Sequence, residues 1–214
     1  IMLSLQIFDS VEVCLDGQAL KLPASRKTRA LLVYLVRCGG SLRRDHLCEM
    51  LWGLRDDSRG ALRWSLCKLR PILNADGRDR LRTDRDRVQI DMQGLLVDLH
   101  VIRACAADDA ASTAELMRAW EQMGLPLMRD CELPGQAPFM AWIEDQRREV
   151  QKLRTGLSQR LALCSEVSSE EKQLWTQRWS DDAENVSYTR RELSATGGDD
   201  EFAASTSGAV APAP

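Results

Sequence analysis

One stretch decides how this chain folds: Ser58-Arg59-Gly60-Ala61-Leu62-Arg63-Trp64-Ser65-Leu66-Cys67-Lys68-Leu69-Arg70-Pro71-Ile72-Leu73. Wound at about 100° per residue, a helix brings its leucines onto one stripe that must be buried: Leu62, Leu66, Leu69 and Leu73. The side chains opposite that stripe, or on its flank, are Arg59, Arg63, Trp64, Cys67, Lys68 and Arg70. No acid lies between Arg59 and Arg70 to balance this basic side through i,i+4 pairs. Such a helix either enters the major groove of DNA or is a solvated basic face.

The residues before this stretch predict a small sheet and two further helices. Three short antiparallel strands are expected, over residues 3–8, 11–15 and 18–22, with Asp16-Gly17 as the turn between the last two. Ser25 is a suitable N-cap for a helix that runs to Cys38, and another helix is expected over residues 43–52. The first turn after Ser25 holds Arg26, Lys27 and Arg29, where the helix dipole disfavours cations. These three serve either solubility or a phosphate.

A second hairpin is expected after the decisive helix, which Pro71 should kink or end. Residues 80–91 alternate like two strands and carry several arginines near their turn: Arg80, Arg82, Arg85 and Arg87. Asp79, Asp84 and Asp86 counter part of that charge, but an exposed arginine on a hairpin can enter a minor groove. Three strands, three helices and a basic hairpin, in this order, predict a winged helix-turn-helix over residues 1–96.

The charge of the chain is divided unequally. The formal net charge is −3, but residues 1–91 have a net charge of +5 and residues 92–214 one of −8. This asymmetry suggests that the front part meets a polyanion while the remainder has another task.

The second part, residues 97–196, is predicted to be all-helical. One long helix is expected to bury a continuous face made of Phe139, Trp142, Ile143, Val150, Leu153, Leu157 and Leu161. The cations between them are expected to stay in solvent: Arg147, Arg148, Lys152 and Arg154. Residues 168–196 suggest a further helix pair, with Trp175 and Trp179 in one member and Tyr188 and Leu193 in the other. Residues 197–214 are rich in Ala, Ser, Gly and Pro, and we expect a disordered tail.

Six motifs carry a resemblance to a known family. RKTRALLVYL (26–35), RDHLCEMLW (44–52) and ALRWSLCKLR (61–70) resemble the winged helix-turn-helix of the SARP-type bacterial transcriptional regulators, over residues 2–91. VDLHVI (97–102), AELMRAW (114–120) and PFMAWIEDQRR (138–148) are similar to the bacterial transcriptional activator domain that follows it in that family. The resemblance implies a tetratricopeptide-like helical domain for self-association, binding to direct repeats near promoters as a homodimer, and contact with RNA polymerase.

Signs of catalysis, cofactors, metal binding and membrane insertion are missing from the sequence. The seven cysteines are never spaced as Cys-x-x-Cys, which argues against a disulfide framework and a zinc site. No phosphate loop, Gly-x-Ser-x-Gly or His-Glu-x-x-His motif occurs, and we expect structural or surface roles for His46 and His100. No long apolar run or signal peptide is seen, so we expect a cytoplasmic protein that is not an enzyme, uses no cofactor and has no membrane partner.

The sequence therefore favours a mainly α protein with a small β part that binds double-stranded DNA and regulates transcription, as an activator. The residues predicted to contact DNA are Arg59, Arg63, Trp64, Lys68, Arg70, Arg82, Arg85 and Arg87. Trp64 can touch a thymine methyl or pack on a neighbouring helix, and packing is favoured slightly; Arg70 can instead pair with Glu49. The alternative is an interaction module in which a degenerate winged helix no longer binds DNA and the helical repeats bind a peptide.

Overall fold

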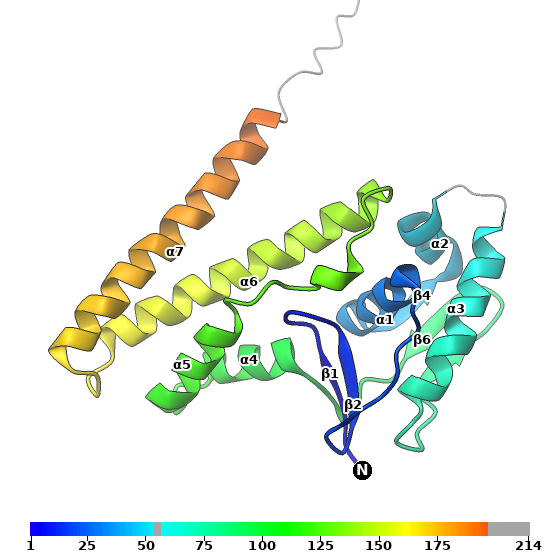
Figure 1. The fold of residues 1–214 in the computed structure, drawn as a ribbon, viewed down its shortest axis with the longest axis horizontal. Coiled ribbons are helices and arrows are strands. Elements are labelled where there is room, and N and C mark those ends of the chain that lie inside the picture. Colours follow the sequence, from blue (N-terminus) through cyan, green and yellow to red (C-terminus); the bar gives the residue numbers. More distant parts are fainter. Residues whose placement is uncertain (54–56, 197–214) are drawn as a thin grey trace, which may run out of the picture.

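The computed structural model describes residues 1–53 and 57–196, and for residues 185–196 it describes the helical backbone alone. Within those residues the protein is mainly helical, with two small sheets. Figure 1 shows the sheets and the first three helices at one end, and two long helices, α6 and α7, extending away from them. The tail predicted over residues 197–214 lies outside the described residues.

The N-terminal sheet contains the three predicted strands and one more. β1 (Leu3–Gln6), β2 (Glu12–Leu15) and β3 (Gln18–Ala19) are antiparallel, as expected from their alternation. The fourth strand, β7 (Leu95–Val97), pairs in parallel with β1 on its other side, so the order is β3-β2-β1-β7. The domain boundary predicted after residue 96 falls within β7.

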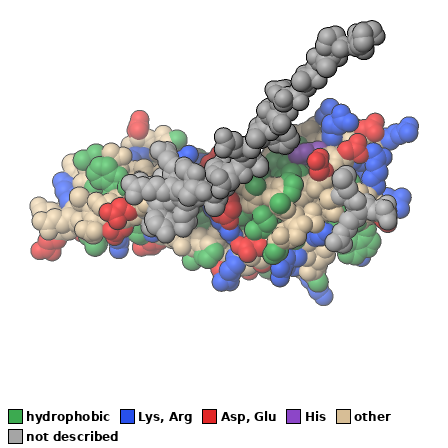
Figure 2. Space-filling model, turned by 90° about the horizontal axis from the view of Figure 1, so that it is seen from above, with side chains coloured by type: hydrophobic (Ala, Val, Ile, Leu, Met, Phe, Trp, Pro, Cys, Tyr) green, Lys and Arg blue, Asp and Glu red, His purple; other side chains and the backbone are tan. Residues whose placement is uncertain are grey.

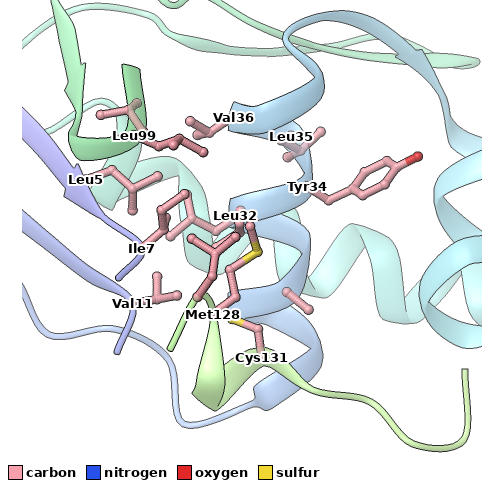
Figure 3. Close-up of a cluster of buried hydrophobic side chains, with 14 of the residues drawn as sticks. Leu5, Ile7, Val11, Leu32, Tyr34, Leu35, Val36, Leu99, Met128 and Cys131 are labelled. Carbon is pink, nitrogen blue, oxygen red and sulfur yellow. The ribbon is translucent and has the colours of Figure 1, made fainter. Parts of the chain in front are cut away.

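Helix α1 (Arg26–Cys38) lies at the centre of the first part of the chain. Its N-cap is Ser25, whose side chain accepts a hydrogen bond from the Thr28 amide, and it ends at Gly39, where φ is +62°. Every residue of α1 from Ala30 to Val36 is buried. Figure 3 shows its neighbours from three other parts of the chain, among them Leu5, Ile7, Leu99, Met128 and Cys131. Because it is buried on every side, α1 gives the other elements a common support.

Helices α2 (Arg44–Trp52) and α3 (Ser58–Leu73) follow α1 at the predicted positions. The predicted leucine stripe of α3 is buried, with no leucine of it more than 3% exposed. Asp57 caps α3 by accepting from the Gly60 amide, and Pro71 lies within the last turn, which continues to Leu73.

A second sheet completes the first part of the chain. The predicted hairpin is formed by β5 (Leu81–Thr83) and β6 (Arg87–Ile90). The short strand β4 (Gly40–Arg43), between α1 and α2, adds to the edge of β6, giving the order β4-β6-β5. Residues 40–43 had not been predicted as a strand.

The second part contains four helices and a short 3-10 turn. They are α4 (Asp98–Ala107), α5 (Thr113–Gln122), η1 (Arg129–Cys131), α6 (Ala137–Leu163) and α7 (Ser169–Thr196). The long helix is confirmed in α6. The prediction of a helix pair over residues 168–196 is wrong. The segment forms one continuous helix, α7, because no Gly or Pro interrupts it.

Two of the four cations expected to be wet on α6 are largely covered. Arg147 donates to the Leu127 carbonyl and pairs with Glu132 at 2.6 Å, and its side chain is 28% exposed. Arg154 lies over the Trp120 ring, 4.0 Å from its centroid, with its side chain 21% exposed. The helical pattern placed their Cα atoms at the edge of the buried face, and their long stems then fold inward over it.

The two parts of the chain are joined by backbone groups at the end of β1. Asp98 accepts from the amides of Ile7 and Phe8, and the Met128 amide donates to the Ile7 carbonyl. Asp130 accepts from the Val11 amide. The first turns of α6 lie against α1, where the rings of Trp142 and Tyr34 meet edge to face with centroids 4.8 Å apart. One hydrophobic cluster therefore runs through both parts.

Candidate nucleic-acid interface

The outer side of α3 is a basic face supported by a packed inner side. Thr28 of α1 and Ser65 of α3 are both buried, and their hydroxyl oxygens lie 3.0 Å apart, so the two helices are held in register by a satisfied polar pair. The exposed side chains on the outer side are Arg59, Arg63, Trp64, Cys67, Lys68 and Arg70. Figure 2 shows Lys and Arg side chains gathered at the end of the molecule that carries α2 and α3.

Three of the predicted cations on α3, Arg59, Arg63 and Lys68, have different surroundings. The Arg59 guanidinium pairs with Asp45 of α2 at 2.5 Å, and this hydrogen bond raises the pKa of Arg59. The Lys68 ammonium lies 5.5 Å from the centroid of the Trp64 ring. Arg63 is exposed and forms no ion pair with any residue that the structure describes. Arg63 is therefore the arginine of α3 that is available to a ligand.

Trp64 does not pack on a neighbouring helix, so the slight preference stated from the sequence is wrong. Its side chain is 51% exposed. The physical reason is its position on the helix, since it lies opposite Leu62 and Leu66, which point into the core. A large exposed aromatic side chain amid cations can contact apolar atoms of a partner.

Arg70 links α3 to the second sheet. Its guanidinium donates to the Thr83 hydroxyl of β5 at 3.0 Å, so the pairing with Glu49 that the sequence suggested is not made. This contact joins the last turn of α3 to the hairpin.

The β5–β6 hairpin presents its three predicted arginines in three ways. Arg85 lies exposed in the turn and has no ion pair to a described residue. Arg82 is 3.6 Å from Asp79, and Arg87 donates to the Ser41 carbonyl at 3.4 Å. The turn itself is shaped by Asp84, whose carboxylate accepts from the amides of residues 86 and 87 at 2.8 and 2.7 Å. These hydrogen bonds hold the pKa of Asp84 below its ordinary value.

Arg80 is not part of the exposed hairpin charge. Its side chain is completely buried, where it forms an ion pair with Asp76 and donates to the carbonyls of Asp91 and Gln93 at 3.1 and 2.6 Å. The hydrogen bonds from Arg80 hold the pKa of Asp76 below its ordinary value. The only signal in the sequence is the i,i+4 spacing of Asp76 and Arg80, within a segment that otherwise indicates a turn.

Arg29, one of the cations at the start of α1, is paired within the protein. Arg29 pairs with Asp130 at 3.1 Å and donates to the carbonyls of Pro23 and Ala24. Neither solubility nor a phosphate is the reason for Arg29, which instead ties α1 to η1.

Two cations next to the predicted set were missed. Arg43 ends β4 with its side chain 72% exposed, and Arg44 begins α2 and donates to the Asp84 carbonyl at 2.9 Å. Both lie beside the hairpin, because β4 pairs with β6 and Arg44 follows β4 directly. The signal that could have found them is the Arg43-Arg44 doublet itself.

No group of His, Cys, Asp and Glu side chains in the described part of the chain is arranged to hold a metal ion. The predicted structural role of the histidines agrees with their contacts: His46 shares a hydrogen bond of 2.7 Å with the Tyr34 hydroxyl, and His100 one of 3.1 Å with Arg37. All seven cysteines are free. Among the described helices, none has the length and apolar character needed to cross a bilayer.

Comparisons with known proteins give a distant structural likeness. The chain matches no protein-family model and no characterised protein sequence. Among solved structures, it is similar to a chain of Mycobacterium tuberculosis EmbR, determined in complex with a low-affinity phosphopeptide, with 17% identity and a TM-score of 0.43. The likeness covers 93% of this chain and 60% of the EmbR chain, so this chain spans less than two thirds of that length. A likeness this distant assigns no function.

Proposed function

We propose that this protein is a DNA-binding transcriptional regulator in which α1–α3 and the β5–β6 hairpin form a winged helix-turn-helix. The observation that carries the proposal is the outer side of α3, where Arg63 and Lys68 stand exposed with no acid on the same helix between Arg59 and Arg70. A rigid helix of this kind, backed by a buried leucine stripe, has the shape that the major groove admits.

The surroundings of the individual arginines suggest that each makes a different kind of contact with DNA. Arg63 is unpaired among the described residues and suits bidentate contact with a guanine, which is worth about 1–3 kcal/mol of discrimination. Arg59 is paired with Asp45, which neutralises part of its charge, so it is less available to DNA than Arg63. Arg85, exposed in the turn of the hairpin, suits an adjacent minor groove.

The role of the second part follows from the family resemblance of its motifs. We propose that α4–α7 form the tetratricopeptide-like unit, which supports self-association on direct-repeat promoter sites and contacts RNA polymerase. The shared core between the two parts supports this, because it would transmit the position of the DNA-binding face to the helical unit. The proposed regulator acts in the cytoplasm and performs no reaction of its own.

The test is the salt dependence of binding to duplex DNA, followed by fluorescence anisotropy with the full chain. We expect the observed association constant to fall with salt, with a slope of about −0.9 per phosphate contacted. Arg63→Ala should weaken binding, whereas Arg118→Ala, which removes an exposed arginine from α5, should leave it unchanged. No binding of folded protein to any duplex at low salt would contradict the proposal.

Trp64 favours a second candidate, an interaction module that binds protein through the same face. A half-exposed tryptophan on α3 is typical of the centre of a protein interface. Several basic residues near it are already engaged, as in the Arg59–Asp45 pair. Binding to a protein would depend little on salt and would be lost in Trp64→Ala, while DNA binding depends steeply on salt and would be lost mainly in Arg63→Ala.

A further inference from the structure

The register of the second sheet places its polar side chains on one face. Residues directly opposite each other in antiparallel strands share a face, as do residues two apart in one strand. Arg43 pairs with Arg87, and Gln89 pairs with Ser41 on one side and Arg82 on the other. All five residues are exposed, and we term this surface the outer face of the second sheet: Ser41, Arg43, Arg82, Arg87 and Gln89.

The outer face points away from α3. The alternate residues of the same strands, Leu81, Val88 and Ile90, are buried, so the inner face packs on the core. Thr83 belongs to the inner face, because it pairs with Val88, and it accepts the hydrogen bond from Arg70 of α3. A ligand on the outer face is therefore separate from one bound along α3.

The outer face carries three arginines, of which Arg82 lies 3.6 Å from the Asp79 carboxylate. The register sets Arg43 directly across from Arg87, and like charges in that position are destabilising. The nearest carboxylate to Arg43 is that of Asp45 at 3.8 Å, but Asp45 is shared with Arg59 at 2.5 Å. The Arg87 guanidinium donates only to Ser41 in the described part of the chain, to its carbonyl at 3.4 Å and its hydroxyl at 3.5 Å. The repulsion between Arg43 and Arg87 therefore lowers the stability of the folded protein unless a bound anion neutralises it.

A hollow of about 150 Å³ lies at the turn end of this face, lined by four residues of the outer face, Ser41, Arg82, Arg87 and Gln89, and by Thr83 and Asp84 where β5 ends. Guanidinium, hydroxyl and amide donors surround it, and it has room for several water molecules or a tetrahedral oxyanion. The Asp84 carboxylate accepts from two backbone amides, which reduces its repulsion of an anion. Guanidinium groups match phosphate oxygens in two-pronged hydrogen bonds.

We propose that the outer face of the second sheet binds phosphate groups of a DNA backbone, beyond the duplex segment that α3 occupies. The inference rests on the proposed function. The cations belong to three neighbouring strands, each about 4.8 Å from the next, so they form a row about 10 Å long. Such a row fits consecutive phosphates of a polymer better than a single small anion. The face thereby lengthens the footprint without reading sequence.

The experiment compares salt slopes on a mixed-sequence duplex of about 30 base pairs, near three helical turns. The double variant Arg43→Ala, Arg87→Ala should make the slope shallower by about 2, because two phosphate contacts are removed at about 0.9 each. Arg118→Ala is the matched control for loss of an exposed arginine and should keep the wild-type slope. Unchanged thermal unfolding of each variant shows that the fold is intact.

The outcomes separate this inference from the proposed function. If the wild type binds no duplex at low salt, the proposed function fails and the inference fails with it. If Arg63→Ala weakens binding but the double variant keeps the wild-type slope, the inference alone is overturned. A last experiment titrates the protein with inorganic phosphate and follows the arginine Nε–H resonances. Saturable phosphate binding at the outer face, combined with the same salt slope for DNA binding in the wild type and the double variant, would show that the face binds a small anion and not DNA.

Discussion

The base of the β5–β6 hairpin and the outer side of α3 use the same residue type for opposite purposes. At the base, Arg80 is wholly buried and satisfied by one carboxylate and two carbonyls. On α3, Arg63 is exposed and has no ionic partner among the described residues. The first arrangement is closed to any ligand, and the second is open to one.

This difference shows that the role of an arginine in this chain, structural or open to a ligand, depends on the residues around it. Arg29, Arg147 and Arg154 belong with Arg80, because each is largely covered and paired within the protein. Arg85 resembles Arg63, because it is exposed and has no ion pair with a described residue. Buried pairs of this kind hold separate segments together, whereas exposed unpaired guanidinium groups keep their hydration until a partner replaces it.

The largest effect is expected from Arg80→Ala. The change leaves Asp76, whose side chain is 3% exposed, without its buried partner and removes donors from two carbonyls. We expect the free energy of unfolding to fall by about 3–5 kcal/mol in urea denaturation. Arg82→Ala, an exposed neighbour on the same hairpin, is the control and should cost under about 0.5 kcal/mol.

Replacing both members of the pair sharpens the comparison. Arg80→Met combined with Asp76→Leu exchanges a buried ion pair for apolar side chains and leaves no unpaired charge. We expect most of the lost stability to return, to within about 1–2 kcal/mol of the wild type. A double variant as unstable as Arg80→Ala would mean that the hydrogen bonds to the carbonyls dominate.

A second buried carboxylate should behave like Asp76 but more mildly. Asp182 of α7 is 4% exposed and accepts from the Trp120 indole at 3.0 Å, with the Arg154 guanidinium 3.6 Å away. Asp182→Ala should cost about 1–3 kcal/mol and raise hydrogen exchange in α7 first. Asp181→Ala, at the exposed neighbouring position, should leave exchange unchanged.

The Asp76–Arg80 pair also predicts part of the acid sensitivity. The pKa of Asp76 is lowered in the folded protein, so the unfolded chain binds its proton at a higher pH. Stability from this pair is present above the ordinary carboxyl pKa of about 3.9 and is lost as the pH falls through the folded value. Unfolding in urea, measured from about pH 5 downward, should show a steeper loss for the wild type than for the Arg80→Met, Asp76→Leu variant. Equal slopes would contradict the assignment.

Much of the first part of the fold could be predicted from the sequence, because its signals are local. The leucine spacing of α3, the Ser25 cap and the alternation of β1 and β2 each act within a few residues. Strands β4 and β7 were missed because each is short and depends on a partner distant in sequence, β6 and β1 respectively. Pairing of that kind leaves no periodic signal.

The candidate site was predicted in its residue types but not in its partners. The sequence placed Arg59, Arg63 and Lys68 on one side of a helix, and the structure has them exposed there. It could not show that Asp45 would hold Arg59, or that Trp64 would stay open, because those outcomes depend on how α2 lies against α3. Side-chain direction across elements is fixed by tertiary packing.

The smallest effect on stability is expected from Arg63→Ala. An exposed side chain without an ionic partner in the described part of the chain contributes little to folding, so the free energy of unfolding should change by less than about 0.5 kcal/mol. Thermal and urea unfolding measure this directly. A larger loss of stability would mean that Arg63, like Arg80, serves the fold, and would contradict the difference drawn between them.

The most direct test of the central claim is selection of binding sites from a pool of random duplexes, with the wild type and Arg63→Ala side by side. We predict that the wild type enriches one motif, and that Arg63→Ala loses a guanine preference at one position while the rest of the motif persists. Enrichment of the same motif by both proteins would remove Arg63 from base readout. No enrichment by the wild type would contradict sequence-specific DNA binding by α3.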